Sequence, residues 1–408
     1  MAIRSYEHAL MYLLALEKKG IFLSVETTQK ALELLGNPQR KFPSVLVAGT
    51  NGKGATVAML SSILRQAGYQ DGTYISPHLL DVRERIQFNG KMIGKQELVF
   101  LVNELDQFLK KTKIYLSFFE FMTVMAFLYY ARKKVDFAVV EVGLGGRLDA
   151  TNVLMPEVSV ITSIDFDHQR LLGNTLSKIA YEKAGIIKPN GKVVTAVSQS
   201  KIQRQFQAVC RKRKATLFIL GRDFFIEPHF ELSLAGKLHQ RKNASCAIAV
   251  ARLLRQKGWA VSEKAIQKGL KSTHWPGRLE VIRQKPLVML DGAHNPAGIQ
   301  MLLQALKNDF QYRKLHVVMG VLADKNYKKM FKLISSYADS LSYIELPVRR
   351  ALRSDQLFKT LPYLKRKVRR EYDIDAVLPR VIRQAHRDDL VCVTGSLYTV
   401  SEAKRLFL

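Results

Sequence analysis

One segment near the N-terminus constrains the fold more than any other, because a short apolar run, a glycine-rich loop and a helical pattern follow one another directly. Residues Ser44–Gly49 (SVLVAG) are largely β-branched or apolar and end in glycine, as expected of a buried strand. The loop Gly49–Gly54 reads GTNGKG, and Ala55–Ala67 has helical periodicity that stops at Gly68, a typical C-cap. This order predicts a phosphate-binding loop inside a parallel α/β sheet.

The loop has the residue types that phosphate binding requires. Glycines let the backbone curl so that its N–H groups face phosphate oxygens, and the helix that follows presents its positive end to the same anion. Lys53 can reach the β- and γ-phosphates as a point charge. The alternative, a glycine-rich surface turn with an unrelated lysine, leaves the flanking strand and helix without a role. ATP contacts are therefore expected from Gly49, Thr50, Asn51, Gly52, Lys53, Gly54, Ala55 and Thr56.

The loop departs from the usual Walker pattern at one point. A Ser or Thr normally follows the lysine directly and binds magnesium with its hydroxyl. Here Gly54 and Ala55 come first, so that Thr56 or a residue elsewhere would supply that hydroxyl.

Strand and helix signals alternate in two blocks along the chain. The first block adds strand candidates at Phe137–Gly143 and Glu157–Ser163, with a helix near Phe121–Arg132. The second block starts near Pro286, and each of its strand candidates ends in glycine: Leu287–Gly292, Leu315–Gly320 and Leu390–Gly395. Apolar strands that alternate with helices predict parallel sheets covered on both faces. The break between the blocks predicts two domains, residues 1–284 and 285–408.

Composition argues against a membrane-spanning or disulfide-bonded protein. No run approaches the roughly 20 apolar residues that a membrane helix needs. The N-terminal segment carries Glu7 and Glu17 within its apolar periodicity, which is typical of an amphipathic helix and not of a signal peptide. Cys210, Cys246 and Cys392 are far apart and form no CxxC pair, which disfavours a zinc site and favours a reducing, cytoplasmic location.

The net charge of +29 has two interpretations. The protein could handle polyanions, or basic residues could simply be spread over solvated surfaces. The densest runs, Arg211–Lys214 and Lys365–Arg370, lack the interleaved aromatic residues that stack on bases. We therefore expect no nucleic-acid or membrane partner and a monomer that acts on small molecules.

Acidic and histidine residues follow two strand candidates. Glu141 lies in the run VVEVGLGGRLDATN, and His168 follows Asp165 and Asp167 in SIDFDH. Alone, Glu141 could be a salt-bridged core acid and His168 a structural histidine. Together, near a phosphate loop, oxygen ligands and one imidazole favour a magnesium that nucleotide phosphates also hold.

Seven motifs in order resemble the folylpolyglutamate synthase/dihydrofolate synthase family, part of the wider Mur ligase group. They span nearly the whole chain: GTNGKG, YISPHL (Tyr74–Leu79), EVGLGGRLDATN (Glu141–Asn152), DHQRLLGNTLSKIAYEKAGIIKP (Asp167–Pro189), HWPGRLE (His274–Glu280), DGAHNP (Asp291–Pro296) and TGSLY (Thr394–Tyr398). The resemblance implies a P-loop ATPase domain with a mostly parallel sheet plus a smaller Rossmann-like C-terminal domain, with the active site between them.

The resemblance also implies roles for particular residues. Ser76, Glu141, His168 and a carbamylated Lys183 would bind magnesium, and a monovalent cation is a further candidate ion. Asn243, Arg278 and Asp291 would contact ATP. Lys53, His168, Lys183 and His294 would be the catalytic residues. The pterin or folate site would be lined by Ser117, Phe118, Phe119, Glu120, Leu148, Asp149 and Ala150.

The implied activity is ATP-dependent ligation of L-glutamate to dihydropteroate through an acyl phosphate, with extension of the glutamate tail of reduced folates as a second expected activity. Asp149 in RLDATN resembles the family members that act on dihydropteroate. Two positions depart from the family pattern: Ala55 stands where a Ser is usual, and Ser117 stands where relatives often have Thr.

Three other interpretations compete. A peptidoglycan-type Mur ligase, acting on another carboxylate, usually carries an extra N-terminal domain, whereas this loop begins at residue 49. A nucleic-acid-binding P-loop ATPase leaves DGAHNP and RLDATN unexplained. A nucleotide-binding homologue without ligase activity is suggested by Ala55 alone.

Overall fold

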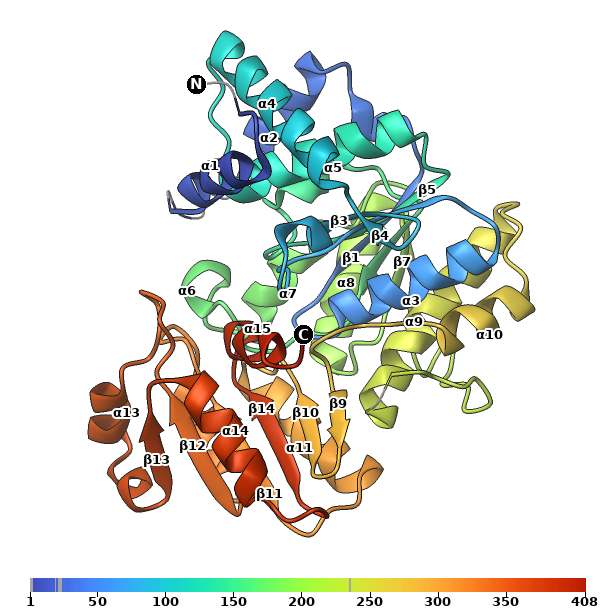
Figure 1. Cartoon of the computed structure of the whole chain (residues 1–408). Coiled ribbons are helices and arrows are strands. Elements are labelled where there is room, and N and C mark those ends of the chain that lie inside the picture. Colours follow the sequence, from blue (N-terminus) through green and yellow to red (C-terminus); the bar gives the residue numbers. More distant parts are fainter. Residues whose placement is uncertain (1–2, 19, 21–23, 235) are drawn as a thin grey trace. The chain divides into compact units, whose positions relative to one another are not determined.

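The computed structural model describes residues 3–18, 20, 24–234 and 236–408. These residues form two compact units (Figure 1). The first comprises the described residues of 1–164, 174–233 and 241–273, and the second those of 165–173, 234–240 and 274–408. Each unit is built around a sheet of its own.

The first unit contains an eight-stranded sheet with the order β4-β3-β2-β5-β1-β6-β7-β8. All neighbours from β2 to β8 pair in parallel, and only β3 and β4 at one edge are antiparallel. The central strands are buried along their whole length, as their apolar sequences require. The strands are β1 (Ser44–Ala48), β2 (Asp71–Tyr74), β3 (Ile86–Phe88), β4 (Lys91–Met92), β5 (Phe137–Glu141), β6 (Val158–Ile161), β7 (Lys192–Thr195) and β8 (Thr216–Ile219).

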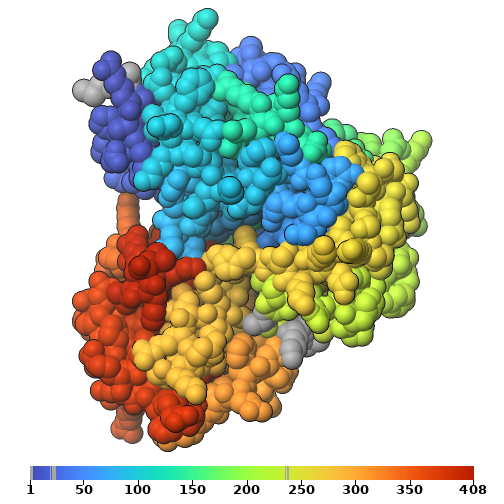
Figure 2. Space-filling view, turned by 45° about the vertical axis from the view of Figure 1, so that its right-hand side comes forward, coloured from blue at the N-terminus to red at the C-terminus, as the bar shows by residue number. Residues whose placement is uncertain are grey.

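Helices surround this sheet, and α3 packs on β1, β2 and β5. Gly269 of α10 meets α3 so closely that a Cβ there would lie 2.5 Å from the Cα of Ile63, and the two helices lie side by side in Figures 1 and 2. The helices are α1 (Tyr6–Lys18), α2 (Val25–Leu34), η1 (Pro38–Arg40), α3 (Lys53–Gln66), η2 (Val82–Arg85), α4 (Lys95–Thr112), α5 (Phe118–Lys133), η3 (Ala150–Val153), α7 (Leu176–Ala184), α8 (Ser200–Arg213), α9 (Lys237–Gln256), whose first residues belong to the second unit, and α10 (Glu263–Lys271).

The second unit contains a six-stranded sheet with the order β13-β12-β11-β14-β10-β9, parallel except for β9. The strands are β9 (Glu280–Gln284), β10 (Leu287–Leu290), β11 (Leu315–Met319), β12 (Ser340–Ile344), β13 (Val368–Glu371) and β14 (Leu390–Thr394). The helices are α6 (Gln169–Leu172), α11 (Pro296–Asp309), α12 (Tyr327–Ile334), α13 (Ser354–Thr360), η4 (Pro362–Arg366), α14 (Ile374–Gln384) and α15 (Leu397–Arg405).

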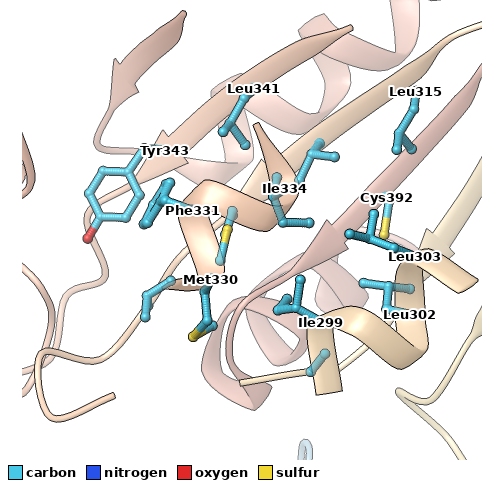
Figure 3. Close-up of a cluster of buried hydrophobic side chains, with 14 of the residues drawn as sticks. Ile299, Leu302, Leu303, Leu315, Met330, Phe331, Ile334, Leu341, Tyr343 and Cys392 are labelled. Carbon is cyan, nitrogen blue, oxygen red and sulfur yellow. The ribbon is translucent and has the colours of Figure 1, made fainter. Parts of the chain in front are cut away.

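The core of the second unit lies between one face of its sheet and two helices (Figure 3). Alternate residues of β11, namely Leu315, Val317 and Met319, belong to this core because side chains of a strand alternate between faces. Phe331 of α12 meets Tyr343 of β12 edge-to-face, with ring centroids 5.6 Å apart.

The structure confirms the α/β fold class and the strand candidates, with only small shifts at their ends. Helix α3 begins at Lys53, two residues before the predicted start, so that the lysine opens the helix. None of the helices formed by the described residues combines the length and apolarity that a bilayer crossing needs.

The division into units differs from the predicted boundary at 284/285. Strand β9 ends at Gln284, yet it pairs with β10 as the edge of the second sheet, and the last segment of the second unit begins at His274. The short Lys285-Pro286 connection is therefore a turn between two paired strands. The segment 165–173, which includes His168, also belongs to the second unit.

Candidate active site

The phosphate loop joins β1 to α3 and is held by Thr162 and Ser163, the two residues that follow the neighbouring strand β6. The backbone N–H groups of Thr50 and Asn51 donate to the carbonyl and the hydroxyl of Ser163, both at 2.9 Å. The hydroxyl of Thr162 donates to the Asn51 carbonyl at 2.7 Å. Gly52 is the N-cap of α3 and offers no side-chain cap to the first turn. The loop is thus held in place at the N-terminus of a helix, which suits it to bind an anion.

Two glycines of this loop are required by close contacts. A Cβ on Gly49 would lie 1.8 Å from Oγ1 of Thr162, and a Cβ on Gly52 would lie 2.3 Å from Oδ1 of Asn243. Gly52 also has a φ of +87°, in the left-handed region that other residues rarely adopt. Asn243, predicted to contact ATP, therefore lies directly against the loop.

Lys53 stands beside a buried carboxylate at the end of β5. Its Nζ is 3.8 Å from Oε1 of Glu141, which is 4% exposed. The other carboxylate oxygen accepts the backbone N–H of Ser76 at 3.1 Å. The structure thus brings together Lys53 and two of the predicted metal ligands, Ser76 and Glu141.

These oxygen donors fit a hard divalent cation such as Mg²⁺. Within the described part of the chain, no cluster of three or more His, Cys, Asp or Glu side chains could hold a metal ion alone. Mg²⁺ characteristically takes only one or two protein carboxylates and completes its shell with water and phosphate oxygens, and Glu141 would supply one such carboxylate.

Lys183 of α7 reaches the same loop. It is 5% exposed, and its Nζ donates to the carbonyl oxygen of Gly49 at 2.9 Å. This placement differs from that of a lysine on a helix surface. Carbamylation of Lys183 stays a prediction.

The hydroxyl of Thr56 is already engaged. Thr56 is fully buried, and its Oγ1 donates to the carbonyl of Gly52 one turn earlier at 3.0 Å. This bond uses the one hydrogen of the hydroxyl, as is common for Thr within a helix, and leaves the lone pairs of the oxygen. Because Thr56 is fully buried, its burial favours Ser76 over Thr56 as the source of a hydroxyl for a metal.

The predicted acceptor-binding residues at the start of α5 form a buried capping box. Oε2 of Glu120 accepts from the backbone N–H of Ser117 at 2.8 Å and from its hydroxyl at 2.6 Å. Oε1 of Glu120 is buried and has no hydrogen-bond partner among the described residues. The ring of Phe119 lies against the segment that follows β5, because a Cβ on Gly143 would be 2.4 Å from its Cζ. Phe118 carries the guanidinium of Arg85 over its ring at 5.0 Å.

Asp149 is buried and organises the RLDATN loop. Its carboxylate accepts from the backbone N–H groups of Leu144 (2.8 Å) and Thr151 (3.0 Å), and it caps η3. Burial raises the pKa of Asp149, while these bonds, the Thr151 hydroxyl and the charge of Lys53 act in the opposite direction. Leu148 and Ala150 flank this carboxylate.

In the second unit, Asp167 gathers side chains from three segments. Its carboxylate lies 2.6 Å from Nζ of Lys325, 3.4 Å from Nε2 of His294 and 3.8 Å from Nε2 of His168, and it accepts from Nδ2 of Asn295 at 3.2 Å. Burial alone would raise the pKa of Asp167, but the hydrogen bond with His294 and the charge of Lys325 hold it well below its usual range.

Sequence reasoning predicted only the two histidines of this cluster. Asp167 and Asn295 are the sequence neighbours of these histidines in SIDFDH and DGAHNP, and this adjacency could have identified them as members of the cluster. Lys325 follows β11 by six residues in an unremarkable ADKN stretch, and no local pattern marks it.

Arg278 and Asp291 lie together in the second unit. Asp291 accepts the backbone N–H groups of Leu279 and Ala293, both at 2.9 Å, and so ties the HWPGRLE segment to the DGAHNP segment. Nη1 of Arg278 is buried without a hydrogen-bond partner in the described structure, and a Cβ on Gly292 would lie 1.9 Å from it. Asp291 therefore has a structural task, while Arg278 presents a donor suited to an anion.

Comparison with known families agrees with this geometry. Residues 47–223 match the Mur ligase middle domain, and residues 277–397 match the Mur ligase glutamate ligase domain. With the phosphate loop and the two sheets, these matches define an ATP-dependent ligase of the Mur type.

Individual relatives narrow the family. The chain is 35% identical to the dihydrofolate synthase/folylpolyglutamate synthase of Bacillus subtilis, over 98% of this chain and 99% of that protein. It resembles the solved structure of Escherichia coli FolC in complex with DHPP and ADP, with a TM-score of 0.89, 30% identity and coverage of 99% and 97% of the two chains. It also resembles the Yersinia pestis enzyme complexed with AMPPNP and Mn, with a TM-score of 0.88, 29% identity and coverage of 99% and 98%. The chain belongs to the dihydrofolate synthase/folylpolyglutamate synthase family.

Proposed function

We propose that this chain ligates L-glutamate to dihydropteroate at the expense of ATP, and that it also extends the glutamate tail of reduced folates. The observation that carries the proposal is the arrangement around the phosphate loop: Lys53 opens α3, Lys183 contacts Gly49, and Glu141 lies beside Lys53. The relatives named for both activities, and the one solved with DHPP and ADP, support the acceptor class.

The chemistry follows from the need to activate a carboxylate. A carboxylate does not react with an amine at neutral pH, so the acceptor carboxylate attacks the γ-phosphorus of ATP and forms an acyl phosphate and ADP. Lys53 and the amides of the first turn of α3 stabilise the charge on the transferring phosphoryl group. The amine of glutamate then attacks the carbonyl carbon, and phosphate leaves.

A divalent cation would add charge stabilisation to this transfer. Ser76 and Glu141 would hold it, since they lie together beside Lys53. A carbamylated Lys183 would add two oxygen ligands near Gly49, and His168 stays a predicted ligand. The relative solved with AMPPNP and Mn supports a divalent ion.

For the acceptor, we propose that the α5 N-terminus and the RLDATN loop recognise the pterin. Oε1 of Glu120, buried without a partner in the described structure, would accept a hydrogen bond from a ring N–H or amino group. Asp149 has a positioning task in this proposal, because three protein donors already occupy its carboxylate.

Glutamate-dependent release of ADP tests the function. The purified protein receives ATP, Mg²⁺ and L-glutamate with either dihydropteroate or tetrahydrofolate. Release with dihydropteroate establishes the synthase, and release with both acceptors establishes both activities. Folded protein that binds ATP but releases no ADP with either acceptor would overturn the proposal in favour of another acceptor or an inactive homologue.

A substitution separates the two acceptors. Asp149→Asn keeps an oxygen acceptor but weakens the cap of η3, whereas Asp149→Ala would also leave buried donors unpaired. We expect Asp149→Asn to impair the dihydropteroate reaction more than folate extension, and equal losses would count against a pterin-specific loop.

We also propose a cytosolic monomer. Cys210, Cys246 and Cys392 are buried as free thiols, which suits a reducing compartment. Light scattering coupled to size-exclusion chromatography tests the oligomeric state.

A further inference from the structure

The RLDATN loop is packed against the end of the helix that carries Lys183. The backbone N–H of Arg147 donates to the Glu182 carbonyl at 2.7 Å. A Cβ on Gly185 would lie 2.3 Å from the Cα of Arg147, and a Cβ on Gly146 would lie 2.9 Å from the Glu182 carbonyl oxygen. The loop and the end of α7 are therefore in backbone contact, with no room for an intervening side chain.

A lysine beyond α7 joins the far end of this loop to the same place. Nζ of Lys188 donates to the backbone carbonyl of Asn152 at 2.6 Å and to its Oδ1 at 2.8 Å. Nδ2 of Asn152 in turn lies 3.0 Å from the Arg147 carbonyl and 3.4 Å from the Gly185 carbonyl, both of which accept from it. Three of these hydrogen bonds connect the asparagine to the turn that follows α7, and the fourth, to Arg147, lies within the loop itself.

The turn itself is anchored from two other elements. The hydroxyl of Ser159 on β6 donates to the Ile186 carbonyl at 2.8 Å, and Arg213 at the end of α8 donates to the carbonyls of Gly185 and Ile187. The turn is therefore fixed in place, and Asn152 attaches η3 to it through the two shorter bonds with Lys188 and the longer bond with the Gly185 carbonyl.

We propose that Lys188 and Asn152 are positioning residues for the ligase reaction. Their contact fixes the acceptor-binding RLDATN loop against the helix that carries Lys183. The acceptor is thereby held at a constant position relative to the phosphate loop. This inference rests on the proposed function. Asp149 is the N-cap of η3, and its carbonyl accepts the backbone N–H of Asn152 at 2.9 Å, so a shift of Asn152 moves Asp149. Lys183 precedes Lys188 by five residues and contacts Gly49 of the phosphate loop.

Steady-state kinetics test the proposal with Lys188→Met, Asn152→Ala and the double variant. Lys188→Met keeps the length of the side chain but removes every donor. We expect the KM for dihydropteroate to rise about tenfold, as is typical when a supporting contact is lost, while the KM for ATP stays within about twofold. The two single changes share the loss of one bond, from Nζ of Lys188 to Oδ1 of Asn152, so the effect of the double variant should be smaller than the sum of the two single effects.

Two further variants serve as controls. Lys188→Arg restores a cationic donor and should recover most of the loss. Lys178→Met removes a positive charge from the exposed face of α7 and should leave both KM values unchanged. Equal rises in the KM for dihydropteroate and ATP, or unchanged kinetics in Lys188→Met, would overturn the positioning role.

Amide hydrogen exchange without substrates distinguishes failure of this inference from failure of the proposed function. The amides of 144–153 should exchange faster in Lys188→Met than in the wild type, while those of β1 keep their rate. Unchanged exchange of the amides of 144–153 would overturn the proposal that the Lys188–Asn152 contact fixes this loop, whatever reaction the enzyme catalyses. If the wild-type protein releases no ADP, the proposed function is overturned. The exchange measurement still shows whether the Lys188–Asn152 contact fixes the loop.

Discussion

The phosphate loop of the first unit and the Asp167 cluster of the second unit are built in opposite ways. The loop is one continuous segment, Gly49–Gly54, and it offers an anion the N-terminus of α3, which has no side-chain cap, together with Lys53. The cluster is made of side chains from three separate segments, which include Asp167, His294 and Lys325. Its Lys325–Asp167 ion pair is short, at 2.6 Å, whereas Nζ of Lys53 is 3.8 Å from Oε1 of Glu141.

Because of this difference, we expect substitutions in the loop to affect catalysis and substitutions in the cluster to affect stability. A backbone loop keeps its shape when one side chain changes, so Lys53, 19% exposed, is available for catalysis at little structural cost. In the cluster, Asp167 and Lys325 have side chains only 9% and 6% exposed, so each depends on the other for compensation of its buried charge.

The largest expected effect tests the loop. Lys53→Ala should lower ligation by about 10³-fold, because the charge on the transferring phosphoryl group loses its compensating cation. The free energy of unfolding should change little. ADP release and urea denaturation measure the two quantities.

Lys41→Ala is the matched control, since Lys41 is an exposed lysine shortly before β1. Near-wild-type turnover in Lys53→Ala would show that the loop is not part of the active site. A large loss of stability would instead make Lys53 a structural residue and break the contrast with the cluster.

The next effect tests the cluster. Asp167→Asn leaves the buried ammonium of Lys325 without its carboxylate and should lower the free energy of unfolding by about 3 kcal/mol. The pKa of Asp167 lies below its usual range in the folded state, so its contribution is present above the unfolded pKa. The difference from the wild type should therefore persist down to about pH 4 and shrink below it.

Asp388→Asn is the control for this change, because Asp388 is an exposed aspartate, with a side chain that is 61% exposed. It should cost no more than about 0.5 kcal/mol. A similarly small effect of Asp167→Asn in urea denaturation would show that the cluster is not held by its charges.

A third prediction sharpens the contrast by changing the loop backbone. Gly52→Ala places a Cβ 2.3 Å from Oδ1 of Asn243 at a φ of +87° and should weaken ATP binding by about 100-fold, since the amides would leave their positions. Isothermal titration calorimetry with a nonhydrolysable ATP analogue measures the change.

Gly68→Ala is the control that separates the effect of backbone strain from the effect of a steric clash of the new Cβ. Its φ of +92° imposes a comparable backbone strain, but no atom lies within 4 Å of the new Cβ. It should lose about 1 kcal/mol of stability and no ATP affinity. Equal losses of affinity in both variants would attribute the effect to general destabilisation.

The smallest effect concerns Lys188, a half-buried lysine of the first unit. Burial, with a further contribution from Arg213, lowers the pKa of Lys188 to about 8. Between this value and the unfolded pKa near 10.4 the unfolded state binds more protons, so stability rises with pH through this window. Relative to Lys188→Met, the wild type should gain about 2 kcal/mol from pH 7 to pH 10.

Paired urea denaturations at the two pH values measure this gain. If the difference in unfolding free energy between the wild type and Lys188→Met does not vary with pH, Lys188 does not titrate between pH 7 and pH 10 in the folded protein. Lys178→Met, an exposed change on α7, should show no such dependence.

By itself, the sequence determined the α/β class, the strands β1, β5 and β6 and the phosphate loop, because hydrophobic runs, glycines and helix signals act over a few neighbouring residues. It also determined the family, since seven spaced motifs are a strong joint signal. These predictions needed no knowledge of which strands are neighbours.

Only the tertiary structure decided which distant side chains meet. Lys325 joins Asp167 because their segments come together in the second unit, and nothing in the residues around Lys325 encodes that encounter. In the same way, the contact of Lys188 with Asn152 joins residues 36 positions apart and depends on packing. Local patterns specify elements, whereas the convergence of side chains follows from how those elements pack.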